Sequence, residues 1–313
     1  MSNLSNKTVL VTGAHGFLGR HTARTLAQMG CEVIGIGHGD WAPETWRRWG
    51  ISEWHACEVS LENMLVYARE PAAIFHFAGS GAVGFSLTHP AQDYKRTVEG
   101  TLHVLEFIRL HASGARLIYP SSAGVYGCVE SLPITEDFPL APVSPYGVHK
   151  KMTEDLIRSY SRHFGVSSAI IRFFSVYGPE LRKQLLWDAC RKAKRLLTTF
   201  PGTGQETRDW LHVSDAASLA FAAMNHASTE CPIVNGGFGV SATVRDVLDH
   251  VFSLVQPGAR IDFSGQARPG DPRDYRADIT RARSFGWQPA VDWRSGIRDY
   301  VEWFLGDAEN KVS

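Results

Sequence analysis

Tyr146 and Lys150 are the pair of residues in this chain whose types and spacing most directly suggest chemistry. They lie four residues apart, directly after Ser144 and Pro145. In a helix this spacing places both side chains on one face, and Ser144 and Pro145 suit the N-cap and first turn. A lysine ammonium stabilises a neighbouring phenolate, so we expect the pKa of Tyr146 to fall from about 10 toward neutrality. Such a tyrosine can exchange a proton with an alcohol or a carbonyl group.

A glycine-rich turn near the N-terminus lies where a dinucleotide could bind. A predicted strand at residues 7–12 runs into glycines at positions 13, 16 and 19, and a helical pattern follows at 20–29. This order directs the amide groups of a helix N-terminus toward a pyrophosphate. The alternative is an ordinary glycine turn. We favour the dinucleotide site, in which the cofactor contacts Gly13, His15, Gly16, Phe17, Leu18 and Gly19.

The end of the second predicted strand, residues 32–36, bears on the choice of cofactor. NAD sites usually place an acidic residue there to bind the ribose 2′-hydroxyl, whereas this chain has Gly37 and His38. Because His38 could donate a hydrogen bond to a 2′-phosphate, we expect NADP(H). Asp40 is close enough to serve an NAD site after a small shift, so NAD remains the alternative.

Further predicted strands bring their carboxyl ends to one edge of a parallel sheet, where such folds bind ligands. One ends at residues 57–59, and the others lie at residues 73–79 and 116–122, the last of which ends at Ser122. His76 is interpreted as a core histidine. The residues expected near the cofactor are Glu58, Val59, Phe77, Ala78 and Gly79. The pattern predicts an α/β fold, a Rossmann-type doubly wound parallel sheet.

Two long helices are predicted at residues 94–109 and 146–164. Each carries an apolar stripe, and in the second helix the stripe lies away from Tyr146 and Lys150. The stripes could pack in the core or pair with their copies in a homodimer. We keep both interpretations and expect a homodimer formed through the two helices.

Four segments together resemble the extended short-chain dehydrogenase/reductase family. They are the glycine turn at 12–19, the strand end at 75–79, residues 121–127, and the Tyr146–Lys150 pair, in that order. Nearest in pattern are the nucleotide-sugar 4-epimerases and 4-keto-sugar reductases. The resemblance implies that Ser122 binds the sugar C4 oxygen and that Tyr146 is the acid/base. It also implies that Lys150 binds the nicotinamide ribose and lowers the Tyr146 pKa.

The resemblance extends to the substrate side of the site. Two further segments, at residues 202–215 and 267–272, resemble stretches in which an arginine holds the diphosphate of a nucleotide sugar. Thr97, on the cofactor side, and Ser175 stand where family members often have asparagine. The residues expected to contact substrate are Ser80, Ser122, Ser175, Arg208 and Arg268. Near the next predicted helix, Arg182, Lys183 and Gln184 could face a phosphate or base, or form a solvated helix start.

The same resemblance predicts two interleaved domains. Residues 1–178 form the dinucleotide-binding domain, with about 212–240 returning to it. Residues 179–211 and 241–313 form the smaller domain that binds the nucleotide sugar.

The residues that follow Ser122 reduce the number of reactions that the site could catalyse. Dehydratases of this family carry an Asp-Glu pair where this chain has Ala123 and Gly124. Ala123 also lacks the cysteine of the GDP-fucose synthase type, although Cys128 is near in sequence. We therefore expect reduction of the 4-keto group of a nucleotide-linked 4-keto-6-deoxyhexose. The alternative is a nucleotide-sugar 4-epimerase with tightly held NAD. A non-catalytic cofactor sensor is a lesser alternative.

Composition sets limits on other functions. Lys plus Arg and Asp plus Glu each number 32 in 313 residues, so no net charge points to nucleic acid or a membrane. The five cysteines are scattered and indicate neither a disulfide framework nor a metal site. No leader or apolar span is apparent. We expect a cytoplasmic enzyme whose partner is its nucleotide-sugar substrate.

Overall fold

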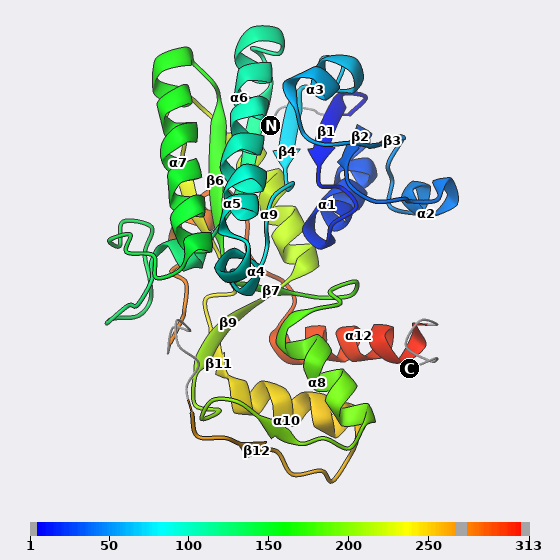
Figure 1. Ribbon diagram of the computed structural model, residues 1–313, viewed down its shortest axis with the longest axis vertical. Helices are drawn as coiled ribbons and strands as arrows, with labels where there is room; N and C mark the ends of the chain where they lie inside the picture. The colour runs from blue at the N-terminus through cyan, green and yellow to red at the C-terminus, as the bar shows by residue number, and fades with distance from the viewer. Residues whose placement is uncertain (1–4, 267–273, 308–313) are drawn as a thin grey trace.

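A seven-stranded parallel sheet forms the centre of the larger lobe (Figure 1). The computed structural model describes residues 5–266 and 274–307. The strand order is β10-β6-β5-β4-β1-β2-β3. The strands are β1 (Thr8–Thr12), β2 (Glu32–Gly37), β3 (Glu53–Ala56), β4 (Ala73–His76), β5 (Arg116–Ser122), β6 (Ser168–Phe173) and β10 (Ile233–Gly236). All paired neighbours run parallel, which confirms the predicted doubly wound α/β fold.

Helices cover both faces of this sheet because successive strand residues point to opposite faces. In β1, Val9 and Val11 join one apolar core, whereas Leu10 joins another. The first core lies under α1 (Phe17–Gln28) and α9 (Val213–His226). The second lies under α3 (Leu61–Tyr67), α6 (Gly100–His111) and α7 (Pro145–Phe164). Shorter helices of this lobe are α2 (Pro43–Arg48), α4 (Val83–Thr88), α5 (Pro90–Tyr94) and α11 (Thr280–Ser284).

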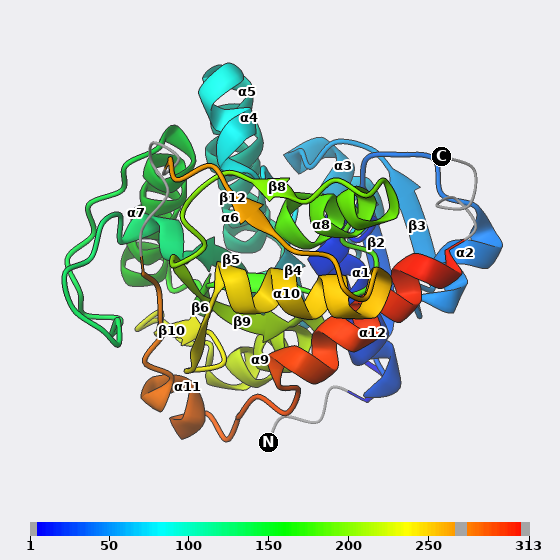
Figure 2. The same cartoon turned by 90° about the horizontal axis from the view of Figure 1, so that it is seen from below.

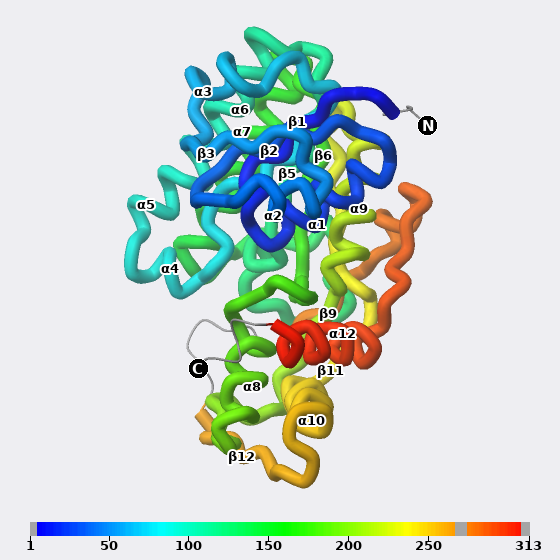
Figure 3. Tube along the Cα trace, turned by 90° about the vertical axis from the view of Figure 1, so that its right-hand side faces the viewer, coloured from blue at the N-terminus to red at the C-terminus, as the bar shows by residue number. Residues whose placement is uncertain are grey.

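A smaller lobe lies below the carboxyl ends of these strands (Figures 1 and 3). It contains the sheet β11-β9-β7 and the pair β12-β8. Its strands are β7 (Ser175–Tyr177), β8 (Thr199–Phe200), β9 (Thr207–His212), β11 (Ser241–Thr243) and β12 (Asp262–Phe263). Its helices are α8 (Gln184–Lys194), α10 (Val244–Val255) and α12 (Trp293–Gly306), which share one apolar core. Figure 2 shows α10 and α12 side by side.

The chain enters the smaller lobe, returns to the larger sheet through α9 and β10, and then leaves it again. One part differs from the sequence-based division. Tyr275, Ala282 and Trp287 pack into the core of the larger lobe, so 241–313 does not belong wholly to the smaller one.

Two predicted elements have different boundaries in the structure. The helix expected at 94–109 is interrupted by a π-helical turn, Lys95–Glu99, between α5 and α6. The wider turn changes the phase of the apolar stripe, so Val98 is buried whereas Tyr94 and Leu102 are partly exposed. The third strand ends at Ala56, because the chain turns before Glu58.

Two further structural searches bear on the site. Across residues 5–266 and 274–307, none of the helices combines the length and apolar character that crossing a membrane requires. Within the same residues, no group of histidine, cysteine and acidic side chains is arranged to hold a metal ion, and the five cysteines are free.

Candidate active site

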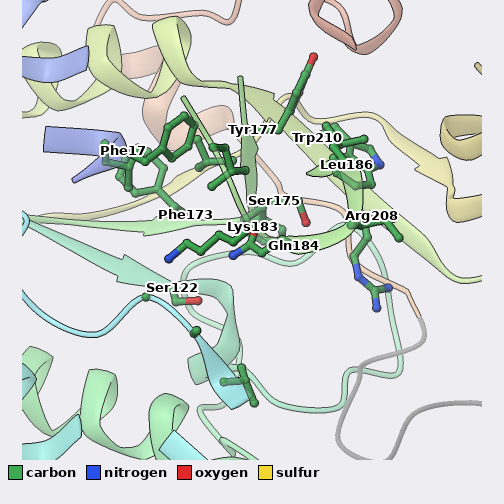
Figure 4. Close-up of a pocket in the computed structure, with 18 of the residues that line it drawn as sticks. Phe17, Ser122, Phe173, Ser175, Tyr177, Lys183, Gln184, Leu186, Arg208 and Trp210 are labelled. Atoms are coloured by element: carbon green, nitrogen blue, oxygen red, sulfur yellow. The ribbon is translucent and has the colours of Figure 1, made fainter. Parts of the chain in front are cut away.

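One cavity of about 1220 Å³ lies between the two lobes, at the carboxyl ends of the central strands. Its walls include the glycine turn, the ends of β4 and β5, the start of α7, and residues of β7 and β9. Figure 4 shows Ser122, Ser175 and Arg208 around it, from β5, β7 and β9. The cavity is therefore large enough to take a nucleotide sugar beside the reactive half of a dinucleotide.

The start of α7 brings Tyr146 and Lys150 into this cavity. Ser144 is the N-cap and accepts a hydrogen bond from the Gly147 amide at 3.2 Å, and Pro145 occupies the first turn. The Tyr146 amide donates to Ser86 Oγ at 3.0 Å, which ties the helix start to α4. The sequence analysis predicted this cap and this pair of side chains on one helix.

Lys150 is buried and hydrogen-bonded. Its Nζ donates to the carbonyl oxygen of Pro120 at 2.8 Å and to Tyr119 Oη at 3.2 Å. Desolvation lowers the pKa of Lys150 to about 8, against the nearby carboxylates of Asp93 and Glu154, which raise it. The lysine is therefore held rigidly at the end of β5, where Ser122 also lies.

The expected fall in the Tyr146 pKa is not what the structure gives. Burial raises the pKa of the Tyr146 phenol, although a hydrogen bond with Ser122 lowers it in part. Lys150 Nζ lies 5.9 Å from the centroid of the Tyr146 ring and is directed to Tyr119 instead. The chain by itself therefore keeps Tyr146 as a neutral phenol beside the Ser122 hydroxyl.

Two groups near this pair were not found from the sequence. Tyr119 is a buried strand residue that looks like core, yet it accepts the Lys150 hydrogen bond. Asp93 is fully buried and lies 2.5 Å from His149 Nδ1, across 56 residues of sequence. Spacing along the chain contains no signal for either contact, because the partners come from different elements.

The glycine turn fits a bound pyrophosphate. Gly13 has φ of +70°, and a Cβ there would lie 2.6 Å from the Ala78 amide nitrogen. A Cβ on Gly19 would lie 2.2 Å from the Gly13 carbonyl oxygen. Only glycines allow this close packing of the turn against α1 and β4. The N-cap of α1, Gly16, has no side chain to satisfy the helix amides, which leaves them for a ligand phosphate.

The predicted cofactor residues fall into two groups. Those that line the cavity are Gly13, Gly16, Phe17, Leu18, Gly19, Phe77, Gly79, Tyr146 and Lys150. Those that do not are His15, His38, Glu58, Val59, Ala78 and Thr97. Thr97 lies in the π-helical turn behind the site, where its Oγ1 accepts a hydrogen bond from the Ser80 amide at 3.4 Å. It acts on the site through Ser80, which does line the cavity.

His15 and His38 lie at the far end of the glycine turn. The His15 Nδ1 is 3.0 Å from the His38 carbonyl oxygen, and its ring packs against Trp41 and Trp54. These aromatic rings therefore lie together near the end of β2, the region where we expected the adenosine ribose to bind. Glu58 and Val59 follow β3 on the same side of the sheet.

The expected substrate residues Ser80, Ser122, Ser175 and Arg208 all line the cavity. The backbone at Arg208 is held in place by its neighbour Asp209, which is fully buried. The Asp209 carboxylate accepts hydrogen bonds from the amides of Phe238, Gly239 and Ala277. Arg268 lies outside the described residues.

A buried polar network supports the catalytic end of the sheet. Glu154 of α7 accepts hydrogen bonds from Ser121 Oγ at 2.5 Å and from Arg172 Nη2 at 2.7 Å. Arg172 also donates to Tyr126 Oη and to the Glu136 carbonyl oxygen. The network holds α7 against β5 and β6. It thereby holds Tyr146, at the start of α7, close to Ser122, at the end of β5. His76 is likewise satisfied, by Thr12 and Thr101, which confirms it as a core histidine.

Fold and site together define an extended short-chain dehydrogenase/reductase, as the sequence motifs predicted. The sequence profile of the NAD dependent epimerase/dehydratase family matches residues 9–236. The chain therefore belongs to this family of nucleotide-sugar enzymes.

Individual relatives are similar over nearly the whole chain. The UDP-glucose 4-epimerase of Azospirillum brasilense is 30% identical over 322 residues, covering 94% of this chain and 91% of the relative. The structure of the Thermotoga maritima UDP-glucose 4-epimerase with UDP-glucose is 26% identical with a TM-score of 0.85, over 95% of this chain and 98% of that one. MoeE5 in complex with UDP-glucuronic acid and NAD is 27% identical with a TM-score of 0.85, over 95% and 99%.

Proposed function

We propose that this protein is a nucleotide-sugar 4-epimerase that retains NAD. The observation that carries the proposal is that one cavity holds Ser122, Tyr146 and Lys150 together with the glycine turn and Arg208. A proton-transfer group, a cation, a dinucleotide site and a diphosphate site are the parts that redox at a sugar carbon needs.

Each side chain has a role that follows from its contacts. Tyr146 takes the proton of the sugar C4 hydroxyl and later returns it, while Ser122 hydrogen-bonds the same oxygen and orients it. Lys150, held by Pro120 and Tyr119, keeps a positive charge 5.9 Å from the centroid of the Tyr146 ring. Arg208 binds the diphosphate. NAD bound at the glycine turn would accept a hydride from C4 and return it, and its charged ring would lower the Tyr146 pKa.

Epimerisation also requires that the oxidised sugar rotate within the site before the hydride returns to C4. The cavity of about 1220 Å³ must therefore hold the sugar in both orientations beside the reactive half of the dinucleotide. Elimination of water is disfavoured, since Ala123 and Gly124 supply neither an acid nor a base beside Ser122.

The relatives favour the alternative of the sequence analysis over its first choice. They include 4-epimerases, and MoeE5 is described with NAD rather than NADP. We therefore propose epimerisation in place of 4-keto reduction, and NAD in place of NADP.

We also propose a homodimer formed through α6 and α7. These helices pack against each other, and Leu102, Val148 and Met152 on them are about 40% exposed. A second copy that packs on these two helices could cover the exposed apolar side chains.

The direct test is to purify the protein, release its bound nucleotide by denaturation, and incubate the native protein with UDP-glucose. The proposal predicts bound NAD and formation of UDP-galactose without added cofactor. Tyr146→Phe should keep the bound NAD but lose turnover by about 10²–10⁴-fold. Stoichiometric oxidation of NADPH by a nucleotide 4-keto sugar, with no epimer formed, would establish the reductase instead.

A further inference from the structure

Lys183 places a cation in the active-site cavity. No residue that the structure describes pairs with this charge. It lines the cavity with Ser122 and Tyr146, and Figure 4 shows its side chain projecting inward. Its Nζ lies 3.4 Å from the position that a Cβ on Gly81 would take, beside the loop that follows β4. Within residues 5–266 and 274–307 it has no hydrogen-bond or ion-pair partner, and desolvation alone lowers its pKa.

The backbone around Lys183 is fixed on both sides. Glu180 and Gln184 have left-handed φ values of +75° and +68°, which non-glycine residues adopt at a cost. Glu180 pairs with Arg20 at 2.8 Å, and Arg182 pairs with Asp307. These pairs engage the neighbouring charges, whereas the Lys183 side chain lines the cavity. Such strain is found where a side chain must be presented to a ligand.

The acids of the cavity wall are already engaged. Glu206 accepts hydrogen bonds from the amides of Thr203 and Gly204, each at 2.9 Å. Asp188 lies 3.5 Å from Lys192. Lys183 is itself exposed to solvent, so its amine is available to pair with an anionic group of a bound ligand.

Lys183 and Arg208 serve different parts of the cavity. Arg208 belongs to β9 of the smaller lobe, whereas Lys183 reaches the loop after β4, the strand beside β5, which ends at Ser122. Figure 4 shows the two side chains entering from separate directions. The Lys183 charge thus lies toward the reacting end of the substrate.

We propose, on the basis of the proposed function, that Lys183 binds a carboxylate on the sugar, so that the preferred substrate is a nucleotide-linked hexuronic acid. An anion could also reach Lys183 from the diphosphate, which every nucleotide sugar carries. The two sources differ in whether removing the lysine affects all nucleotide sugars or only those with an acidic sugar.

The experiment measures the Kd of UDP, UDP-glucose and UDP-glucuronic acid by calorimetry, on the full-length protein with its bound cofactor. We expect the wild type to bind UDP-glucuronic acid about tenfold more tightly than UDP-glucose, the effect of one charge-assisted contact. In Lys183→Met the ratio of the two Kd values should fall to near one, and Lys183→Arg should keep most of it. Arg191→Met, which removes an exposed cation from α8, the helix that follows Lys183, should leave the ratio unchanged.

Two results would overturn the inference. One is a wild type without preference for the acidic sugar. The other is an equal loss of affinity for UDP, UDP-glucose and UDP-glucuronic acid in Lys183→Met, which would place the lysine on the diphosphate. Epimerisation is assayed separately on both sugars. If neither is epimerised the proposed function fails, while the Kd ratio still decides the role of Lys183.

Discussion

Gly147, directly after Tyr146, packs against Gly124 so closely that a Cβ on Gly147 would lie 2.5 Å from the Gly124 carbonyl oxygen. The Gly124 amide in turn donates to Ser122 Oγ at 3.1 Å. The contact between the two glycines therefore sets how near the start of α7 comes to Ser122, and with it the position of the Tyr146 phenol.

Gly147→Ala should push α7 away from Ser122 and misplace Tyr146. We expect kcat to fall about a hundredfold, the size of effect that a displacement near 1 Å can produce. Steady-state kinetics with UDP-glucose measure this. Gly114→Ala is the matched control, because a Cβ there would meet nothing within 4 Å. A Gly147→Ala enzyme with wild-type kcat would show that the contact does not position Tyr146.

The pH dependence of the reaction should report the Lys150 charge. Because burial lowers the pKa of Lys150 to about 8, the amine is protonated below that pH and loses its charge as the pH rises through it. We expect kcat/KM to fall about tenfold per pH unit above pH 8. In Lys150→Arg the guanidinium stays charged, so the basic limb should move up by more than one unit. A limb that stays near 8 in this variant would exclude Lys150 as its origin.

Stability should depend on the Arg172–Glu154 pair, which lies at 2.7 Å with both side chains almost fully buried. Arg172→Met leaves the Glu154 carboxylate buried without its cation, and we expect a loss of about 3–5 kcal/mol in the free energy of unfolding by urea. The double variant Arg172→Met/Glu154→Leu should recover much of this loss.

The exposed pair Lys151–Asp155 provides the comparison for that measurement. Lys151→Met should change the free energy of unfolding by less than about 1 kcal/mol. Equal effects of Arg172→Met and Lys151→Met would mean that the buried network does not hold α7 to the sheet.

The proposed dimer predicts a change of molecular mass with one substitution. Wild-type protein should elute with twice the chain mass in light-scattering chromatography, and Met152→Glu should give a monomer, because a carboxylate would be buried between the helices. Leu197→Glu, at an exposed apolar residue of the smaller lobe, should stay dimeric. A monomeric wild-type protein would contradict the proposed dimer.

Local sequence patterns predicted the elements that depend on local physics. The strand at 116–122 and the helix beginning at Pro145 were found because strand composition, an N-cap and a proline all lie within a few residues. The π-helical turn at Lys95–Glu99 was missed, since one extra residue in a turn leaves no periodic signal.

Motifs identify candidate site residues, whereas contacts between distant segments leave no motif. Ser122, Tyr146 and the glycine turn were selected by their motifs, and all line the cavity. The partners of Lys150 and His149, which are Tyr119 and Asp93, come from other elements and are defined only by tertiary packing. The raised pKa of Tyr146 is a property of burial, which the spacing of Tyr146 and Lys150 does not report.

The most direct test of the central claim uses UDP-glucose labelled with deuterium at C4. The proposed 4-epimerase removes this deuteride and returns it within one active site, so the UDP-galactose formed should keep the label, with no added cofactor consumed. Loss of the label to solvent, or consumption of one reduced cofactor for each product formed, would contradict the account.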